Sequence, residues 1–260
     1  PFTRLQILGS ACATTSDASR VVGGWPTSVE RYPSIVQVEF LENGIWDQWC
    51  GATILNNRNV LSAAHCFYEE VYHPTWRRIR AGSAIRHTGG SIVYIERAIN
   101  HPSFFTGRGF DADLSILRLV SSLEFTPVIQ PATIISQGLI LPDGLPVQYV
   151  GWGHTVVSIM LILKKKLNRD VCAENYFEVF EDILPITENM FCAGLINVGG
   201  RDGCQGDSGG PVYYEDPSGD FLVGVVSFGH GCGRPEYPGV NTAVSSYTDW
   251  IQVHSYIKNG

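Results

Sequence analysis

Short segments rich in valine and isoleucine, separated by turn residues, run through most of the chain. Several of them alternate apolar and polar side chains, which is the pattern of a half-buried β-strand. The clearest examples are residues 34–40, 91–99, 114–120, 146–153 and 221–229. Many short strands with little helix favour a β-barrel or a β-sandwich, so we expect a mostly β protein.

The C-terminus is the one region with clear helical periodicity. The helix expected at about 246–257 places four side chains on one face, namely Tyr247, Trp250, Ile251 and His254. The stretch 121–146 contains proline and glycine and is the best candidate for a connection between two halves of the chain. With 260 residues, of which 44% are apolar, the chain can bury the core of one large or two modest domains.

The charge of the chain argues against two classes of partner. Its formal net charge is −7, which disfavours binding to nucleic acid or to anionic membranes. The only basic run, 164–166, is too short to reverse this. No apolar segment reaches the roughly 18 residues that a membrane span needs. We therefore expect a soluble globular protein that binds neither nucleic acid nor membranes.

The cysteines indicate an oxidising compartment. They are not spaced as CxxC pairs, which argues against a structural zinc site. Six of the seven lie beyond residue 20 and can form three disulfides. The odd one, Cys12, lies in the segment "RLQILGSACA", which resembles the end of a signal peptide cleaved after Ala13. An ordinary flexible N-terminal segment is the alternative, and the sequence leaves both open.

Three short motifs carry the chemistry. They are "LSAAHC" at 61–66, "FDADLSIL" at 110–117 and "GDSGG" at 206–210. A serine hydroxyl is a poor nucleophile until a base removes its proton, and that base is best a histidine oriented by a buried carboxylate. His65, Asp113 and Ser208 supply these groups in the order His, Asp, Ser.

With these motifs, the chain resembles the chymotrypsin-like (S1-type) serine proteases, and within them the trypsins, over nearly all of 21–260. The segment "VVGGW" at 21–25 is similar to the family's mature N-terminus. The resemblance implies two Greek-key six-stranded β-barrels followed by a C-terminal α-helix, with the active site in the cleft between the barrels. The first barrel is expected at about 21–130 and the second at about 131–245.

The resemblance also implies the role of each catalytic group. Ser208 would attack the scissile carbonyl while His65 accepts its proton, and Asp113 would hold the imidazole. Asp113 fits the acid better than Asp111, because the family's acid directly precedes an apolar strand. The backbone N–H groups of Gly206 and Ser208 would form the oxyanion hole, each typically worth about 3–4 kcal/mol.

Specificity follows from the same resemblance. The residue six before the nucleophile, Asp202, would lie at the base of the primary pocket and favour Arg or Lys of the substrate. Gly229 and Gly239 match the small wall positions that keep the pocket open, and Ser227 matches the residue beside them.

Activation and disulfides are implied as well. Cleavage at Arg20-Val21 would free the α-amino group of Val21 to pair with Asp207, which makes residues 1–20 a leader and activation peptide, with a signal-peptide tail possible at 1–13. The family pattern pairs the cysteines as Cys50–Cys66, Cys172–Cys192 and Cys204–Cys232. Cys12 would have no partner in the mature enzyme.

Several features depart from the better-known trypsins. The region 80–96 lacks the paired carboxylates of a calcium loop, so we expect no metal and no cofactor. Residues 154–167 match the family poorly, and their conformation is left open. Asn241 stands where an aromatic residue is common, which would adjust the pocket floor.

Basic residues comprise 14 Arg and 4 Lys, and arginine keeps its charge at higher pH than lysine does. With the three-bridge pattern and the segment "RAGS", the chain resembles the digestive trypsins of insects, particularly those of the caterpillar midgut. We therefore expect a monomer secreted into the gut lumen that meets protein or peptide substrates and protein protease inhibitors.

Two other functions are alternatives for a chain with these motifs. A regulatory protease of a clotting or immune cascade usually carries a disulfide-rich module upstream, and only some 20 residues precede Val21 here. A non-catalytic homologue typically loses its Ser or His. This chain keeps His65, Asp113, Ser208 and Asp202.

Overall fold

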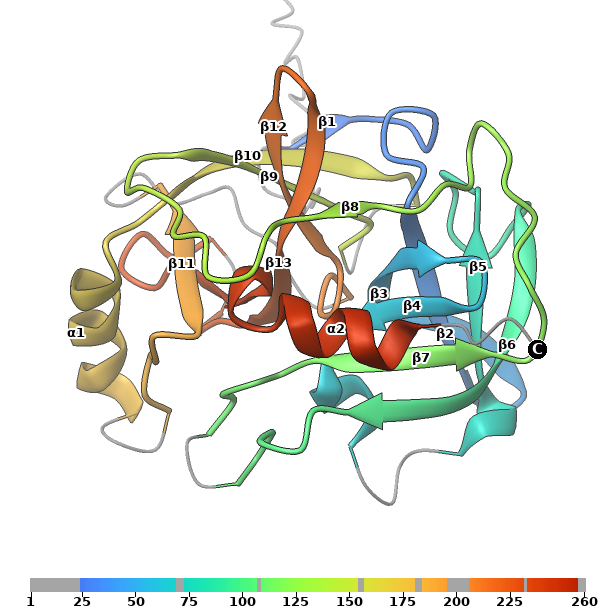
Figure 1. The fold of residues 1–260 in the computed structure, drawn as a ribbon, viewed down its shortest axis with the longest axis horizontal. Coiled ribbons are helices and arrows are strands. Elements are labelled where there is room, and N and C mark those ends of the chain that lie inside the picture. The colour runs from blue at the N-terminus through green and yellow to red at the C-terminus, as the bar shows by residue number, and fades with distance from the viewer. Residues whose placement is uncertain are drawn as a thin grey trace, which may run out of the picture.

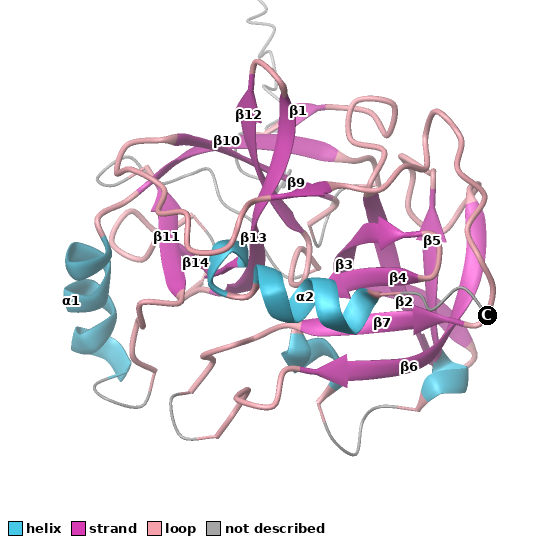
Figure 2. Cartoon of the chain, viewed as in Figure 1, coloured by secondary structure: helices cyan, strands magenta, loops and turns pink. Residues whose placement is uncertain are grey.

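The computed structural model describes residues 24–68, 73–106, 109–153, 157–180, 184–195, 206–231 and 233–256. Most of them belong to strands, and the strands form two closed barrels that lie side by side (Figures 1 and 2). The expected fold class is therefore confirmed, with six antiparallel strands in each barrel.

The first barrel has the strand order β2-β3-β4-β7-β6-β5. Its strands are β2 (Ile35–Glu42), β3 (Ile45–Asn56), β4 (Asn59–Ser62), β5 (Arg77–Ala81), β6 (Ser91–Asn100) and β7 (Ser115–Leu119). Many of their buried side chains are β-branched or leucine, as the alternation in the sequence predicts. Val36, Ile79 and Leu117, for example, are fully buried.

The second barrel has the order β9-β10-β11-β14-β13-β12 and closes through the pairing of β12 with β9. Its strands are β9 (Pro146–Gly151), β10 (Met160–Lys166), β11 (Met190–Gly194), β12 (Pro211–Asp216), β13 (Gly219–Phe228) and β14 (Gly239–Ala243). Two short strands extend its sheet: β1 (Trp25–Pro26) pairs with β10, and β8 (Thr133–Ile134) pairs with β13. The stretch 121–146 connects β7 of the first barrel to β9 of the second.

Helices are few. Within the described residues there are two α-helices, α1 (Arg169–Phe180) and α2 (Thr248–Ser255), and three 3₁₀ turns, η1 (Ala64–Phe67), η3 (Pro74–Trp76) and η4 (Val244–Ser246). Figure 1 shows α2 alongside β7 where the barrels meet, and α1 at the far end of the second barrel. The predicted C-terminal helix is confirmed, whereas the sequence did not predict α1. Cys172 and Tyr176 of α1 are buried, but Val171 and Phe177 are exposed, so no apolar stripe marks this helix.

Residues 154–167, whose conformation the sequence does not predict, contain the regular strand β10. From Met160 to Lys165, β10 pairs residue by residue with β9. Lys164 lies inside, and its Nζ sits 4.0 Å from the centre of the Tyr149 ring. The aromatic face attracts the ammonium group, which explains how a lysine is accommodated inside this barrel.

Candidate active site

His65 lies in η1, directly after β4 of the first barrel. Its Nδ1 is 2.7 Å from Oδ2 of Asp113, and its backbone N–H donates to Oδ1 of the same carboxylate at 2.8 Å. Asp113 is fully buried just before β7. Burial alone lowers the pKa of His65, but the charge of Asp113 and its hydrogen bond reverse this and raise the pKa above its ordinary value.

Two further groups hold the Asp113 residue. Ser227 of β13 donates its hydroxyl to Oδ2 at 2.5 Å, and Thr242 of β14 donates to the backbone carbonyl at 3.3 Å. The alternative acid, Asp111, has other partners: it accepts from Thr187 at 2.8 Å and from Tyr247 at 3.3 Å. The structure thus places Asp113, and not Asp111, against His65.

Ser208 lies in the turn that leads into β12 of the second barrel. The turn packs on the first barrel, because the Ser208 carbonyl accepts the backbone N–H of Gly51 on β3 at 2.8 Å. Sγ of Cys66 lies 4.0 Å from the Ser208 carbonyl oxygen and 3.7 Å from His65 Nε2. The Ser208 backbone and the His65 ring therefore both lie next to the Cys66 sulfur atom.

Glycine is required where this turn approaches the first barrel. Gly209 has a φ of +78°, and a Cβ there would lie 2.2 Å from the Ser62 hydroxyl. Gly206 has a φ of +95°. Its carbonyl accepts from Gln48 Nε2 of β3 at 2.7 Å, while the described residues give the N–H groups of Gly206 and Ser208 no acceptor. Backbone donors left without an acceptor suit an oxyanion hole.

The role of Gln48 is not evident from the sequence. This side chain is buried and ties the first barrel to the Gly206 turn, yet a single glutamine in an alternating strand gives no signal of that role. The hydroxyl contact of Ser227 with Asp113 is not evident from the sequence either, since the resemblance placed Ser227 only beside the substrate pocket.

Asp207, between Gly206 and Ser208, is buried and accepts the backbone N–H of Gly153 at 2.8 Å. A Cβ at Gly151 would lie 2.1 Å from its Oδ1, so the two chains approach closely. Its expected partner Val21, and Arg20 before it, lie outside the described residues.

The pocket residues are described only in part. Gly229 and Gly239 face one another, since a Cβ on Gly229 would lie 4.0 Å from the Gly239 Cα. Asn241 is buried and donates to the hydroxyl of Tyr149 and to the carbonyl of Phe191, so Tyr149 places an aromatic ring beside it. Asp202 lies outside the described residues.

Two of the three expected disulfides are present, Cys50–Cys66 and Cys172–Cys192. Cys12, Cys204 and Cys232 lie outside the described residues. Among the described residues, one group of His, Cys, Asp and Glu has the spacing of a metal site, Cys50 with His65 and Cys66. Both cysteines are in a disulfide, so they offer no thiolate to a metal.

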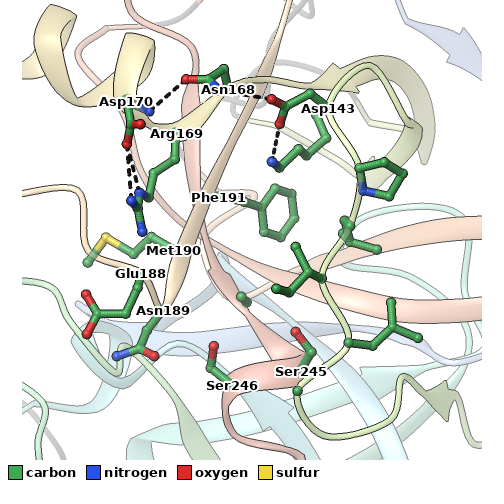
Figure 3. A pocket seen from close by; sticks show the side chains of 17 residues that line it. Asp143, Asn168, Arg169, Asp170, Glu188, Asn189, Met190, Phe191, Ser245 and Ser246 are labelled. Atoms are coloured by element: carbon green, nitrogen blue, oxygen red, sulfur yellow. Dashed lines mark hydrogen bonds and ion pairs between the residues drawn. The ribbon is translucent and has the colours of Figure 1, made fainter.

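A cavity of about 640 Å³ lies away from these residues (Figure 3). It is bordered by residues 138–143, the start of α1, and residues 188–191. Asp143 pairs with Lys166 and accepts from Asn168 on its rim, and Arg169 pairs with Asp170. None of its lining residues is one of the expected catalytic groups.

Two closed β-barrels with a histidine–aspartate pair and a serine turn at their junction have the architecture of a serine hydrolase. The Trypsin family model matches residues 21–251, so the chain belongs to the trypsin family and is a serine endopeptidase. No helix among the described residues is long and apolar enough to cross a membrane.

Lepidopteran relatives support the same assignment. "Trypsin, alkaline C" of Manduca sexta is 37% identical over 98% of this chain and 99% of its own length. "Trypsin CFT-1" of Choristoneura fumiferana is 38% identical over 95% of this chain and 96% of its own. "Achelase-1" of Lonomia achelous is 34% identical over 89% and 99%. The expected similarity to lepidopteran trypsins is therefore confirmed.

Proposed function

We propose that this protease cleaves peptide bonds after Arg or Lys, as a secreted digestive enzyme made as a zymogen. The observation that carries the catalytic part is the two-point contact of His65 with the buried Asp113, beside the turn that bears Ser208. In the mechanism, Ser208 attacks the scissile carbonyl and His65 Nε2 takes its proton, then returns it to the leaving amine.

Asp113 fixes the tautomer needed for that step. Its Oδ2 accepts from Nδ1, which leaves Nε2 unprotonated and able to act as a base toward the serine hydroxyl. The imidazolium that forms is stabilised by the adjacent charge, in the direction of the raised His65 pKa. The N–H groups of Gly206 and Ser208 would receive the negative oxygen of the tetrahedral intermediate.

The preference for Arg or Lys rests on Asp202, six residues before Ser208. A carboxylate at the end of a narrow pocket binds a long cationic side chain and leaves an unpaired charge when the substrate is apolar. The facing glycines Gly229 and Gly239 support this role, because they carry no side chains that would fill the pocket.

Activation would follow cleavage at Arg20-Val21. The new α-amino group of Val21 would pair with the buried Asp207, whose neighbours Gly206 and Ser208 supply the oxyanion donors. An ion pair at this position would order the turn and so couple cleavage to activity. Because the activating bond follows Arg, the mature enzyme could activate its own precursor.

The digestive, extracellular role is supported by the disulfides and by the relatives named as alkaline trypsins. The excess of Arg over Lys fits an alkaline gut lumen, where lysine would begin to lose its charge. We propose a monomer that meets protein substrates and protein protease inhibitors.

Paired chromogenic peptides test the specificity and the activation together. One peptide carries Arg and the other Phe before the scissile bond, and both are assayed before and after nicking at Arg20. Strong cleavage of the Arg peptide alone, dependent on nicking, is expected, and Asp202→Ser should abolish the preference. Preference of the wild type for Phe would overturn the pocket assignment, and equal activity before nicking would overturn the zymogen.

A further inference from the structure

Asp111 is a second buried carboxylate next to the active site, two residues before the catalytic acid. Three donors surround it: Thr187 Oγ1 at 2.8 Å, Asn189 Nδ2 at 3.3 Å and the Tyr247 hydroxyl at 3.3 Å. Thr187 and Asn189 precede β11 of the second barrel, and Tyr247 directly precedes α2. Asp111 therefore ties the segment before β7 to the second barrel and to the C-terminal helix.

The residue between the two carboxylates has an unfavourable backbone conformation. Ala112 has a φ of +54°, in the left-handed region that a residue with a Cβ rarely adopts. The turn is tight, since the Leu114 amide donates to the Ala112 carbonyl at 2.7 Å. Such a conformation persists only where the surroundings hold it, and the three donors fix Asp111, the residue directly before Ala112.

We propose that Asp111 is a positioning residue, which holds the 111–114 turn so that both oxygens of Asp113 face His65. The inference rests on the proposed function, because it concerns the orientation of the proposed catalytic acid. Loss of the Asp111 contacts would let Ala112 relax toward negative φ. The Asp113 carboxylate would then turn away from one or both of its His65 contacts.

Two variants separate the contacts of Asp111 from its charge. Asp111→Asn removes the charge and presents an NH₂ group to the surrounding donors. Thr187→Val keeps the charge and the shape but removes the shortest hydrogen bond. Tyr213→Phe is the matched control, because it removes a buried hydroxyl bonded to Ser34 at 2.6 Å, outside the active site.

Steady-state kinetics on the Arg peptide should show a lower kcat with KM within about twofold of the wild type. We expect a loss of roughly 10- to 100-fold for Asp111→Asn and a smaller loss for Thr187→Val, since misplacement by about 1 Å can cost 10²-fold. Tyr213→Phe should stay within about twofold. In the Asp111→Asn background, Ala112→Gly should restore part of kcat, because glycine adopts positive φ at little cost.

The pH dependence of kcat/KM distinguishes a positioning role of Asp111 from a purely structural one, because only the former changes the pKa of His65. Asp113 raises the His65 pKa, so its displacement should shift the acidic limb of kcat/KM to lower pH. The other titratable groups facing Asp111 are His101 and Tyr247, with Glu188 beside Tyr247. Thr187→Val changes none of these charges, so a shift in this variant reports position rather than charge.

A measurement independent of turnover separates this inference from the proposed function. The proton between His65 Nδ1 and Asp113 gives a downfield NMR signal, which should move upfield or broaden in Asp111→Asn and Thr187→Val but not in Tyr213→Phe. An unchanged signal in both Asp111-site variants overturns the inference, whatever the activity. An intact wild-type signal without peptide cleavage would count against the proposed function alone.

Discussion

At the scale of single residues, the arrangement of Asp113 explains why one tautomer of His65 is favoured. One carboxylate oxygen accepts the backbone amide and the other accepts the ring Nδ1, so the ring cannot rotate without losing a contact. The hydroxyl of Ser227 occupies a further acceptor position of the same oxygen. Three donors therefore point at this fully buried carboxylate. A histidine that acts as a base needs such an acceptor on its Nδ1 side.

Asp113→Asn should therefore lower kcat while leaving the fold intact. An amide in this position can donate to Nδ1 and stabilise the wrong tautomer. We expect a loss of about 10⁴-fold, the magnitude typical of this exchange in a Ser-His-Asp triad. The measurement is kcat on the Arg peptide, with the exposed Asp143→Asn as control. A loss below tenfold would contradict the role of Asp113.

The raised His65 pKa also makes a prediction about stability. A group whose pKa is higher in the folded state stabilises it fully below the unfolded pKa, about 6.5, and this contribution is lost as pH rises through the folded value. The stability difference between Ser208→Ala and Ser208→Ala/His65→Ala should therefore shrink from pH 5 toward alkaline pH. Guanidinium unfolding measures it without self-digestion, and a difference that grows with pH would contradict the assignment.

At the scale of elements, the pairing of β2 with β5 contains a buried charge cluster. Glu39 of β2 is fully buried and accepts from Arg78 and Arg80, two residues apart on β5, each at 2.6 Å. The guanidinium of Arg77, the residue before Arg78, lies 3.6 Å from the centre of the Phe40 ring. Arginine keeps its charge in alkaline solution, so this pairing would survive where a lysine pair would weaken.

Glu39→Gln should be strongly destabilising, because it leaves two largely buried guanidinium groups without a counter-charge. We expect a loss of about 3–5 kcal/mol in the free energy of unfolding, from denaturant titration of the Ser208→Ala protein. The ion pair of the exposed Asp143 with Lys166 is the control, and Asp143→Asn should cost less than about 1 kcal/mol. Equal effects of the two substitutions would refute the importance of the cluster.

The strands and the helix α1 differ in how well the sequence predicts them. The strands were predictable because their apolar residues alternate, and the proposed catalytic groups because each lies in a specific motif. Helix α1 was not predictable, because its buried residues Cys172 and Tyr176 are flanked by exposed apolar residues. Gln48 and Asp111 could not be assigned either. Their roles depend on contacts with residues 158 and 76 positions away, which no local pattern reveals.

At the scale of the whole molecule, the site exists only where the two barrels dock. His65 and Asp113 come from the first barrel and Ser208 from the second, and one buried apolar cluster spans both. Gln48 of β3 donates a hydrogen bond across this junction to Gly206, and Tyr32, in the segment between β1 and β2, donates to Gln148 of β9 at 2.7 Å. Their positions predict different consequences when each is removed.

Gln48→Leu should lower kcat on the order of tenfold with little change in KM, because the Gly206 turn loses its anchor but keeps its N–H donors. The loss should stay below the 10²–10³-fold expected for removal of an oxyanion donor itself. Tyr32→Phe also removes a buried hydrogen bond between distant segments of the chain, and should change stability without changing kcat. If both variants, or neither, lost kcat, Gln48 would have no specific part in the oxyanion turn.

Covalent labelling by a fluorophosphonate tests most directly whether the junction of the barrels activates one serine, since the reagent requires an activated hydroxyl. After nicking at Arg20, mass spectrometry should find one adduct per chain, on the peptide that contains Ser208. The labelling rate should fall by several orders of magnitude in His65→Ala and vanish in Ser208→Ala. Labelling of another serine, or an undiminished rate in His65→Ala, would contradict the assignment of Ser208 and His65 as nucleophile and base.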